Sequence, residues 1–304
     1  MSEYADDEID LRELFSVLWE GRALIAGITG LAASLAVVIS LLMPNIYHAT
    51  ALLSPTEEQS GGLGGLGALA GQFGGLAGLA GISLPSGGGE RAALALEVLK
   101  SRKFVADFVK KHDIAPALLA TDYWDADTGA LVLDTDLYDP KTKKWDETPT
   151  AGNIFDAFTG ALIVEEDATS GMVTVGFKHK SPTVAQQWTV WAVKELNDAI
   201  RNQDIAEAES AIAYLETQVS ATSLAELRKL FFELIQKQTE TMMLAQVRAE
   251  YVFKTVDPAV VPEKKSEPKR ALICVLATLL GGMVAVVMVL MRHYLRTEEK
   301  SPAY

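Results

Sequence analysis

Two stretches of 21 residues without a single charge stand near opposite ends of this chain, at residues 23–43 and 271–291. As helices, each is long enough to cross the roughly 30 Å hydrocarbon core of a bilayer. The stretch between them, residues 44–270, is far too long to be a simple connector. The sequence therefore predicts two transmembrane helices that flank one domain of residues 44–270, with short tails of residues 1–22 and 292–304.

The first apolar run has an alternative interpretation as a cleaved signal peptide. It is longer than the roughly 7 to 15 residues of a signal-peptide h-region, and no small-residue cleavage site follows it. Its N-terminal flank is also acidic rather than basic. We therefore expect residues 23–43 to be retained as a membrane span.

Charges near the two runs leave the orientation of the chain open. Basic residues on the tail side favour cytoplasmic tails, namely Arg22, Arg292, Arg296 and Lys300. Basic residues also crowd the opposite end of the second run, namely Lys264, Lys265, Lys269 and Arg270. The single cysteine, Cys274, lies inside the second run, so the central domain has no thiol to oxidise, which is compatible with a place outside the cytoplasm.

The charge balance argues against nucleic acid as a partner. The chain has a formal net charge of −13, and residues 44–270 contribute 31 acidic and 22 basic residues. Nucleic-acid binding requires a basic patch or stripe, and we find none in this domain. An acidic, solvated surface is the expected result.

A low-complexity segment, residues 61–89, contains 13 glycines among 29 residues. Glycine-rich chain is costly to order, so a flexible linker is one interpretation. Large apolar residues recur through the segment, however, and exposed apolar patches usually mark contacts. We favour a segment that packs on a neighbouring surface through Leu66, Phe73, Leu76 and Leu79.

The alternation and spacing of apolar residues predict a mixed α and β domain. Strands are expected at residues 46–54, 162–166, 172–178 and 251–256, and helices at residues 90–111 and 155–162. The acidic and proline-containing stretch 122–150 is expected to form loops or a short hairpin.

A longer helical pattern opens at Ser181-Pro182 and runs to Val219 without glycine or further proline. Ser223 and Glu226 have the spacing of a capping box that starts a second helix. Because strands precede the first helix and follow the second, the two must form an antiparallel hairpin at about residues 182–250, with its tip near residues 220–223. We expect its core to include Leu227, Phe231 and Leu234.

No pattern in the sequence indicates catalysis, a cofactor or a metal. Phosphate-binding GxxxxGK[ST], HExxH and CxxC patterns are absent. The dispersed carboxylates, such as Asp134 and Asp136, are typical of solvated turns. The four histidines lie in four different segments, namely at His48, His112, His179 and His293.

Two further features concern the membrane. A proline-containing spacer at residues 257–270 is expected to be stiff and extended, and it contains Pro258, Pro262, Pro268, Lys269 and Arg270. Small residues recur every four positions in both apolar runs, a spacing that lets helices approach closely. These rows are Ala26, Gly30 and Ser34 in the first run and Ala277, Gly281 and Ala285 in the second. The alternative is that small residues are merely common in spanning helices.

Several segments together resemble one protein family. The acidic tail contains IDLRELFSVLW, the glycine-rich segment contains GQFGGLAGLAGI, and the long helix opens with SPTVAQQW. QTETMMLAQVRAEYVFKTVDPAVVPE then leads to PKR and the second apolar run. Over nearly its whole length the chain resembles the polysaccharide chain-length determinants, or Wzz-type polysaccharide co-polymerases. It departs from the family at Lys265, where a middle proline of the spacer is usual.

The resemblance implies an α+β membrane protein: two transmembrane helices flanking a periplasmic α/β base domain with a long antiparallel helical hairpin. It implies both termini in the cytoplasm and a bell-shaped homo-oligomeric ring in the bacterial inner membrane. Such a protein is not an enzyme. It sets the modal length of a lipid-linked, O-antigen-like polysaccharide by acting with the polysaccharide polymerase. The growing polysaccharide and membrane lipids are further expected partners, and the flippase is an additional candidate.

Two other function classes remain to be weighed. A transmembrane adaptor would activate a cytoplasmic tyrosine kinase in capsule or exopolysaccharide synthesis, as related co-polymerases do. The tail 292–304 has no nucleotide site, although Tyr294 and Tyr304 could be modified. A periplasmic enzyme held by two anchors is the third class, and it lacks any catalytic constellation.

Overall fold

The computed structural model describes residues 11–56 and 87–298. The chain divides into two compact units. We call Met1–Asn45 with Lys265–Tyr304 the membrane unit, and Ile46–Lys264 the loop domain.

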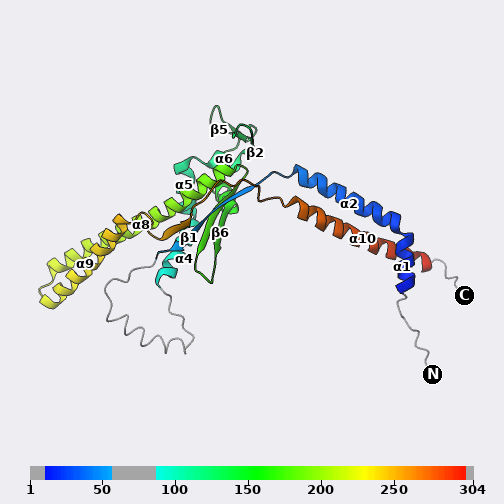
Figure 1. The fold of residues 1–304 in the computed structure, drawn as a ribbon. Coiled ribbons are helices and arrows are strands. Elements are labelled where there is room, and N and C mark those ends of the chain that lie inside the picture. The colour runs from blue at the N-terminus through cyan, green and yellow to red at the C-terminus, as the bar shows by residue number, and fades with distance from the viewer. Residues whose placement is uncertain (1–10, 57–86, 299–304) are drawn as a thin grey trace, which may run out of the picture. The chain divides into compact units, whose positions relative to one another are not determined.

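The membrane unit consists of three helices: α1 (Leu11–Glu20), α2 (Arg22–Leu42) and α10 (Arg270–Glu298). Helices α2 and α10 run alongside each other (Figure 1). Both are long and apolar enough to cross a membrane, with mean hydropathies of 2.3 and 2.7. Their positions agree with the two predicted spans, except that α10 continues as a helix beyond the second apolar run.

The loop domain is built on a four-stranded sheet with the order β6-β7-β1-β8. All neighbouring strands in it are antiparallel. The strands are β1 (Tyr47–Pro55), β6 (Leu162–Glu166), β7 (Val173–His179) and β8 (Phe253–Asp257), close to the predicted positions. The sheet therefore brings the first and last strands of the domain side by side. Gly176 is required in β7, because a Cβ there would lie 2.3 Å from the backbone oxygen of Ala49.

Four short helices and two small hairpins accompany this sheet. The helices are α4 (Gly87–Leu99), α5 (Arg102–His112), α6 (Ala115–Leu119) and α7 (Ala151–Ala161). The hairpins pair β2 (Thr121–Trp124) with β3 (Leu131–Leu133), and β4 (Tyr138–Asp139) with β5 (Lys144–Trp145). These hairpins occupy the stretch that was predicted as loops or a short hairpin.

The most prominent element is the hairpin of α8 (Pro182–Ala221) and α9 (Ala225–Val247). The two helices lie antiparallel and side by side (Figure 1). At 1.5 Å per residue, the longer one extends for about 60 Å. The predicted hairpin is confirmed, with its tip at residues 222–224. Ser181 caps the start of α8, where its side chain accepts a hydrogen bond from the backbone N–H of Val184.

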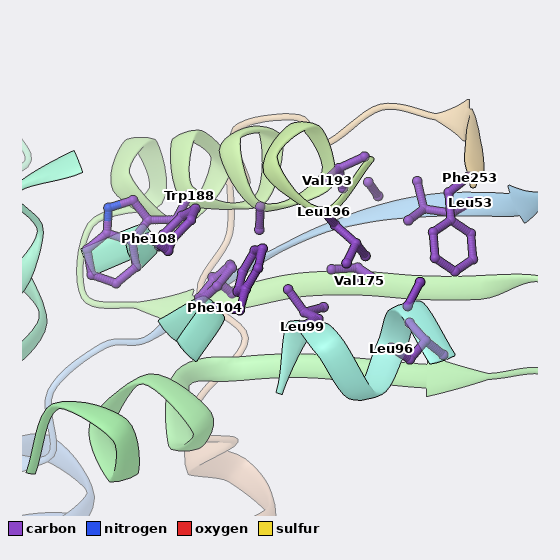
Figure 2. Close-up of a cluster of buried hydrophobic side chains, with 14 of the residues drawn as sticks. Leu53, Leu96, Leu99, Phe104, Phe108, Val175, Trp188, Val193, Leu196 and Phe253 are labelled. Carbon is purple, nitrogen blue, oxygen red and sulfur yellow. The ribbon is translucent and has the colours of Figure 1, made fainter. Parts of the chain in front are cut away.

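Side chains from the sheet, α4, α5 and the first turns of α8 form the core of the loop domain (Figure 2). Trp188 and Leu196 of α8 are 2% and 1% exposed. They share the cluster with Phe108 of α5, Leu99 of α4 and Val175 of β7. Only the first part of α8, next to the sheet, is therefore anchored in this core, because its buried residues end at Ala208.

Two local predictions were wrong. Residues 90–111 do not form one helix, because Ser101 interrupts it and its side chain caps α5 by accepting from the N–H of Phe104 at 3.2 Å. The capping box of Ser223 and Glu226 does not form either. Helix α9 begins one residue later, after Leu224, without a side-chain cap.

Candidate functional surfaces

The predicted small-residue row of α10 lies where α10 meets α2. Ala285 is completely buried, and a Cβ on Gly281 would lie 2.5 Å from the Cβ of Ala32. A residue larger than glycine at position 281 would therefore push the two helices apart. This part of the small-residue prediction corresponds to a close contact within one chain.

The predicted row of α2, Ala26, Gly30 and Ser34, lies on a different face. All three residues are exposed, and a Cβ on Gly30 would meet nothing within 4 Å. The buried positions of α2 are Ala36 and Ser40 instead. With 3.6 residues per turn, residues spaced by four form a stripe along one side of a helix, and one helix can carry several such stripes. The sequence alone does not show which stripe contacts the neighbouring helix.

The proline-containing spacer is attached to the loop domain at its beginning. Ala259, just after Pro258, is buried, and its carbonyl oxygen accepts a hydrogen bond from the side chain of Gln186 at 3.1 Å. Val260 and Val261 are exposed by 69% and 47%. Pro262 follows as a half-buried residue. This half of the spacer is therefore held by α8 rather than being a free tether.

The other half of the spacer belongs to the membrane unit and contains Pro268, Lys269 and Arg270. The side chains of Lys265 and Arg270 each donate to Oδ1 of Asn45, both at 3.1 Å. Desolvation, and secondarily the nearby Arg270 guanidinium, lowers the pKa of Lys265. Lys269 is exposed beside them. A cluster of cations thus stands where α10 begins, as expected for a membrane–water interface.

Asn197 of α8 fastens the hairpin to the sheet. Its Oδ1 accepts hydrogen bonds from the backbone N–H groups of Val252 and Phe253, at 2.8 and 3.0 Å. Its Nδ2 donates to the carbonyl oxygens of Val193 and Phe253, both at 3.2 Å. The buried amide thereby fixes the chain as it enters β8. Sequence reasoning missed this residue, although a polar side chain within an apolar stripe was a usable signal.

A second connection joins α4, α8 and the chain ahead of β8. Arg91 of α4 forms an ion pair with Asp204 of α8. Tyr251 donates its hydroxyl to Asp204 at 2.7 Å and accepts from Arg91 at 3.0 Å. These three residues were also missed, because their pairing joins segments far apart in the sequence. Together with Asn197, they connect α8 to α4 and to the chain that enters β8.

The prediction that Leu227, Phe231 and Leu234 form the hairpin core was wrong for two of the three residues. Leu227 and Leu234 are exposed by 42% and 40%, and Phe231 is half-buried. Ala245 is the only buried residue in α9. Two helices alone share a single seam, so most of the circumference of α9 has no neighbour among residues 11–56 and 87–298. Its exposed large apolar residues, which we call the α9 apolar set, are Leu227, Leu230, Phe232, Leu234, Met243, Leu244 and Val247.

The histidines remain dispersed and serve structural contacts where they are buried. His179 accepts from the backbone N–H of Ser181 at 2.9 Å, and its Nε2 lies 3.0 Å from the carbonyl oxygen of Ala117. His112 stacks on Trp191 with ring centroids 4.2 Å apart. Within residues 11–56 and 87–298, no three His, Cys, Asp or Glu side chains come together as a possible metal site. The predicted contact residues Leu66, Phe73, Leu76 and Leu79 lie outside the described residues.

Two family models match parts of the chain. Residues 7–112 match the family model of Wzz, the chain length determinant protein. This part of the chain therefore corresponds to a Wzz chain length determinant domain. The resemblance seen in the sequence is therefore confirmed. The matched range spans α1, α2, β1, α4 and α5, and so includes the first candidate span and the first strand of the sheet.

A second family model matches the other end of the chain. Residues 226–294 match GNVR, described as a G-rich domain on putative tyrosine kinase. This range covers α9, β8, the spacer and most of α10. The search of curated proteins found no match.

Among solved structures, one match is a full-length bacterial polysaccharide co-polymerase. It is 16% identical, the alignment covers 96% of this chain and 100% of that one, and the TM-score is 0.40. A TM-score this low does not by itself establish a common fold.

Proposed function

We propose that this protein is a non-catalytic, oligomeric regulator of polysaccharide length. It would set the modal chain length of a lipid-linked, O-antigen-like polysaccharide by acting with the polysaccharide polymerase. The observation that carries this proposal is the match of residues 7–112 to chain length determinants. The arrangement of a folded domain between two spanning helices fits a scaffold beside a membrane-bound polymerase.

We further propose that the loop domain is periplasmic and that both tails are cytoplasmic. Arg22 before the first span and Arg292 after the second favour cytoplasmic tails, whereas the basic residues within 264–270 stand at the opposite end of the second span, so the proposal rests on the family resemblance as well. The domain contains no cysteine, so an oxidising compartment would not alter it. Fusion of a reporter that folds only in the periplasm, inserted at the exposed tip residue Ser223, would test this orientation.

The α9 apolar set supports assembly into a homo-oligomer. Its members are exposed in the single chain, and exposed apolar clusters on a helix usually mark an interface. A neighbouring copy of the same hairpin would cover them with a surface of matching length. The exposed row of Ala26, Gly30 and Ser34 offers a second place where helices of neighbouring copies can approach closely.

The decisive experiment is complementation of a deletion strain. Cells that lack the gene should make polysaccharide whose lengths follow an uncontrolled distribution, and the restored gene should return a modal length on a gel. Unchanged length distributions in deleted and complemented cells would refute the proposal. Loss of all polymer on replacement of one carboxylate or histidine would indicate catalysis instead.

The match of residues 226–294 to GNVR favours one alternative, an adaptor for a cytoplasmic tyrosine kinase. An adaptor would change the phosphotyrosine level of a partner kinase in the same cells. We expect no such change on deletion of the gene if length control is the function. A large fall in kinase phosphorylation, with the length ladder unaltered, would favour the adaptor.

A further inference from the structure

Helix α1, which precedes the first span, has two distinct sides. Val17 is 6% exposed and faces into the membrane unit, whereas Phe15 and Trp19 are exposed by 65% and 59%. The two aromatic rings lie one helical turn apart and stack with their centroids 6.0 Å from each other. Exposed aromatic side chains that lie together in this way usually mark a contact surface.

Gly21 sets the direction of α1. Helix α1 ends and α2 begins at this residue, since its N–H donates to the carbonyl oxygen of Val17 and its own carbonyl oxygen accepts from the N–H of Ile25, both at 3.0 Å. A Cβ on Gly21 would lie 2.5 Å from a methyl group of Val289 in α10. The absence of a side chain thus lets the end of α10 pass close to the junction of α1 and α2. Figure 1 shows α1 turned away from the axis of α2 at this point.

The position of Trp19 along the chain restricts what can cover it. Arg22 is the first residue of α2, and the uncharged run begins directly after it. Trp19 lies three residues earlier, about 5 Å along a helix, so it stays close to the level at which α2 enters the membrane. The guanidinium of Arg22 lies over its ring, 5.0 Å from the centroid. Trp beside a cation at the end of a span is typical of the membrane–water interface.

We propose that α1 is an interfacial helix whose Phe15 and Trp19 side chains insert among the lipid headgroups beside α2. The helix is far too short to span a bilayer, and its junction at Gly21 turns it off the spanning direction. Glu20 is exposed next to Trp19, and the tail ahead of α1 is acidic. Aromatic insertion rather than attraction to anionic lipid therefore drives the contact, and it occurs equally on zwitterionic membranes.

Spin labels on the full-length protein test this placement. In a Cys274→Ala background, which removes the only cysteine, single cysteines would replace Phe15, Trp19 or the exposed polar neighbour Glu20. Each nitroxide would be measured in phosphatidylcholine nanodiscs for collision with oxygen and with a water-soluble nickel chelate. We expect labels at 15 and 19 to favour oxygen, and the matched control at 20 to favour the nickel chelate.

Two results would overturn the proposal. Equal collision with nickel at all three positions would place the aromatic pair in water. Low collision with both reagents at 15 and 19 would mean that protein, either a second copy or another partner, covers them.

A measurement with unlabelled protein guards against perturbation by the label. Brominated phosphatidylcholine quenches tryptophans that touch lipid, and the chain has five tryptophans. The difference between the wild-type protein and Trp19→Phe isolates the contribution of Trp19. We expect the variant to lose a clear share of the quenchable signal, without a change in its circular dichroism. Identical quenching of the two proteins would also refute the interfacial placement.

Discussion

At the residue scale, buried polar side chains hold the hairpin to the sheet. Asn197 is 3% exposed and has four backbone partners, so both ends of its amide are satisfied. Thr189, about two helical turns earlier in α8, donates to the carbonyl oxygen of Ala49 in β1 at 2.9 Å. Buried polar groups with complete hydrogen bonding fix one arrangement of the surrounding elements, because any shift would leave a group unpaired.

We predict that Asn197→Ala destabilises the loop domain. The change leaves the N–H groups of Val252 and Phe253 buried without the acceptor Asn197. Each buried donor left unpaired lowers the free energy of unfolding by roughly 1–3 kcal/mol. Guanidinium unfolding of the detergent-solubilised protein, followed by tryptophan fluorescence, measures the loss. Asn202→Ala is the matched control, because Asn202 lies on the exposed side of α8. Equal stability of the two variants would contradict the anchoring role.

We predict a loss of stability on acidification that depends on His179. Burial lowers the pKa of His179 below its ordinary value of 6.5, and hydrogen bonds to Ala117 and Ser181 oppose this only in part. As the pH falls, the unfolded state therefore binds a proton before the folded state does. The contribution is fully present above about pH 6.5 and is lost progressively below it, until the pH reaches the folded-state pKa.

The free energy of unfolding of the wild-type protein and of His179→Gln, measured between pH 8 and pH 4 in roughly half-unit steps, checks this. The variant lacks the titrating group, so its stability should depend less on pH below about 6.5. Parallel curves for the two proteins would show that other groups cause the dependence.

At the element scale, the α2–α10 pair illustrates how one face of each spanning helix is selected. Gly281 and Ala285 of α10 lie in the contact, and α2 contributes Ala32 and Ala36 to it. The exposed row containing Gly30 has the same four-residue spacing, but in the part of the chain that the structure describes a Cβ on Gly30 would meet nothing within 4 Å. Close packing of small side chains is the main source of attraction between helices in lipid, where burial of apolar surface contributes little.

We predict that Gly281→Leu separates α2 from α10 and lowers the melting temperature of the membrane unit in detergent. Overpacking of this kind typically costs about 1–3 kcal/mol. Gly30→Leu is the matched control, since a Cβ at Gly30 meets nothing within 4 Å. If Gly30→Leu alone were to dissociate an oligomer without lowering the melting temperature, the exposed row would be a contact between copies. Equal melting temperatures for Gly281→Leu and the wild-type protein would contradict the close approach of α2 and α10.

At the scale of the whole molecule, the hairpin is anchored to the sheet through the first part of α8, and most of the surface of α9 is exposed. Leu196 and Ile200 of α8 are buried in the core, whereas the α9 apolar set is exposed. Such a division is expected if the first part of α8 stabilises the protomer and α9 serves assembly. Substitutions in α8 and in α9 would then separate effects on folding from effects on the proposed length control.

We predict that Leu227→Ala combined with Leu234→Ala hardly changes protomer stability, because substitutions on exposed surfaces usually stay within about 0.5 kcal/mol. The same variant should weaken the oligomer and shift the modal polysaccharide length. Light scattering of detergent-solubilised protein and the polysaccharide ladder of complemented cells measure the two effects. Leu196→Ala is the contrasting control, expected to cost about 2–5 kcal/mol of stability. An unchanged oligomer and ladder in the double variant would remove α9 from the interface.

We also predict that Pro262→Ala combined with Pro268→Ala shifts the modal length while polymer is still made. Proline restricts the backbone, so the replacement loosens the link between the loop domain and α10. The polysaccharide ladder of complemented cells is the measurement. Glu263→Ala, at an exposed spacer position, is the control. Complete loss of polymer would mean that the spacer is needed for more than length control.

Local patterns in the sequence were sufficient for the elements themselves. The uncharged runs predicted α2 and α10, alternation predicted the strands, and Ser181-Pro182 marked the start of α8. These features depend on hydrophobic length and periodicity, which neighbouring residues determine together. The family resemblance was also visible in contiguous segments and was confirmed by the match of residues 7–112.

Only the tertiary structure decided which surfaces meet. The order β6-β7-β1-β8 places Phe253 next to β1, where Asn197 bonds to the backbone of Val252 and Phe253. The tertiary structure also places Gly281 in the contact between α2 and α10 and leaves Gly30 exposed. In the hairpin, it leaves Leu227 and Leu234 outside the contact between α8 and α9. A repeat in the sequence defines a stripe on an element, but the partner of that stripe comes from a distant part of the chain. Which stripe packs against which neighbour is therefore decided only when the whole chain folds and the elements bury their apolar surfaces against one another.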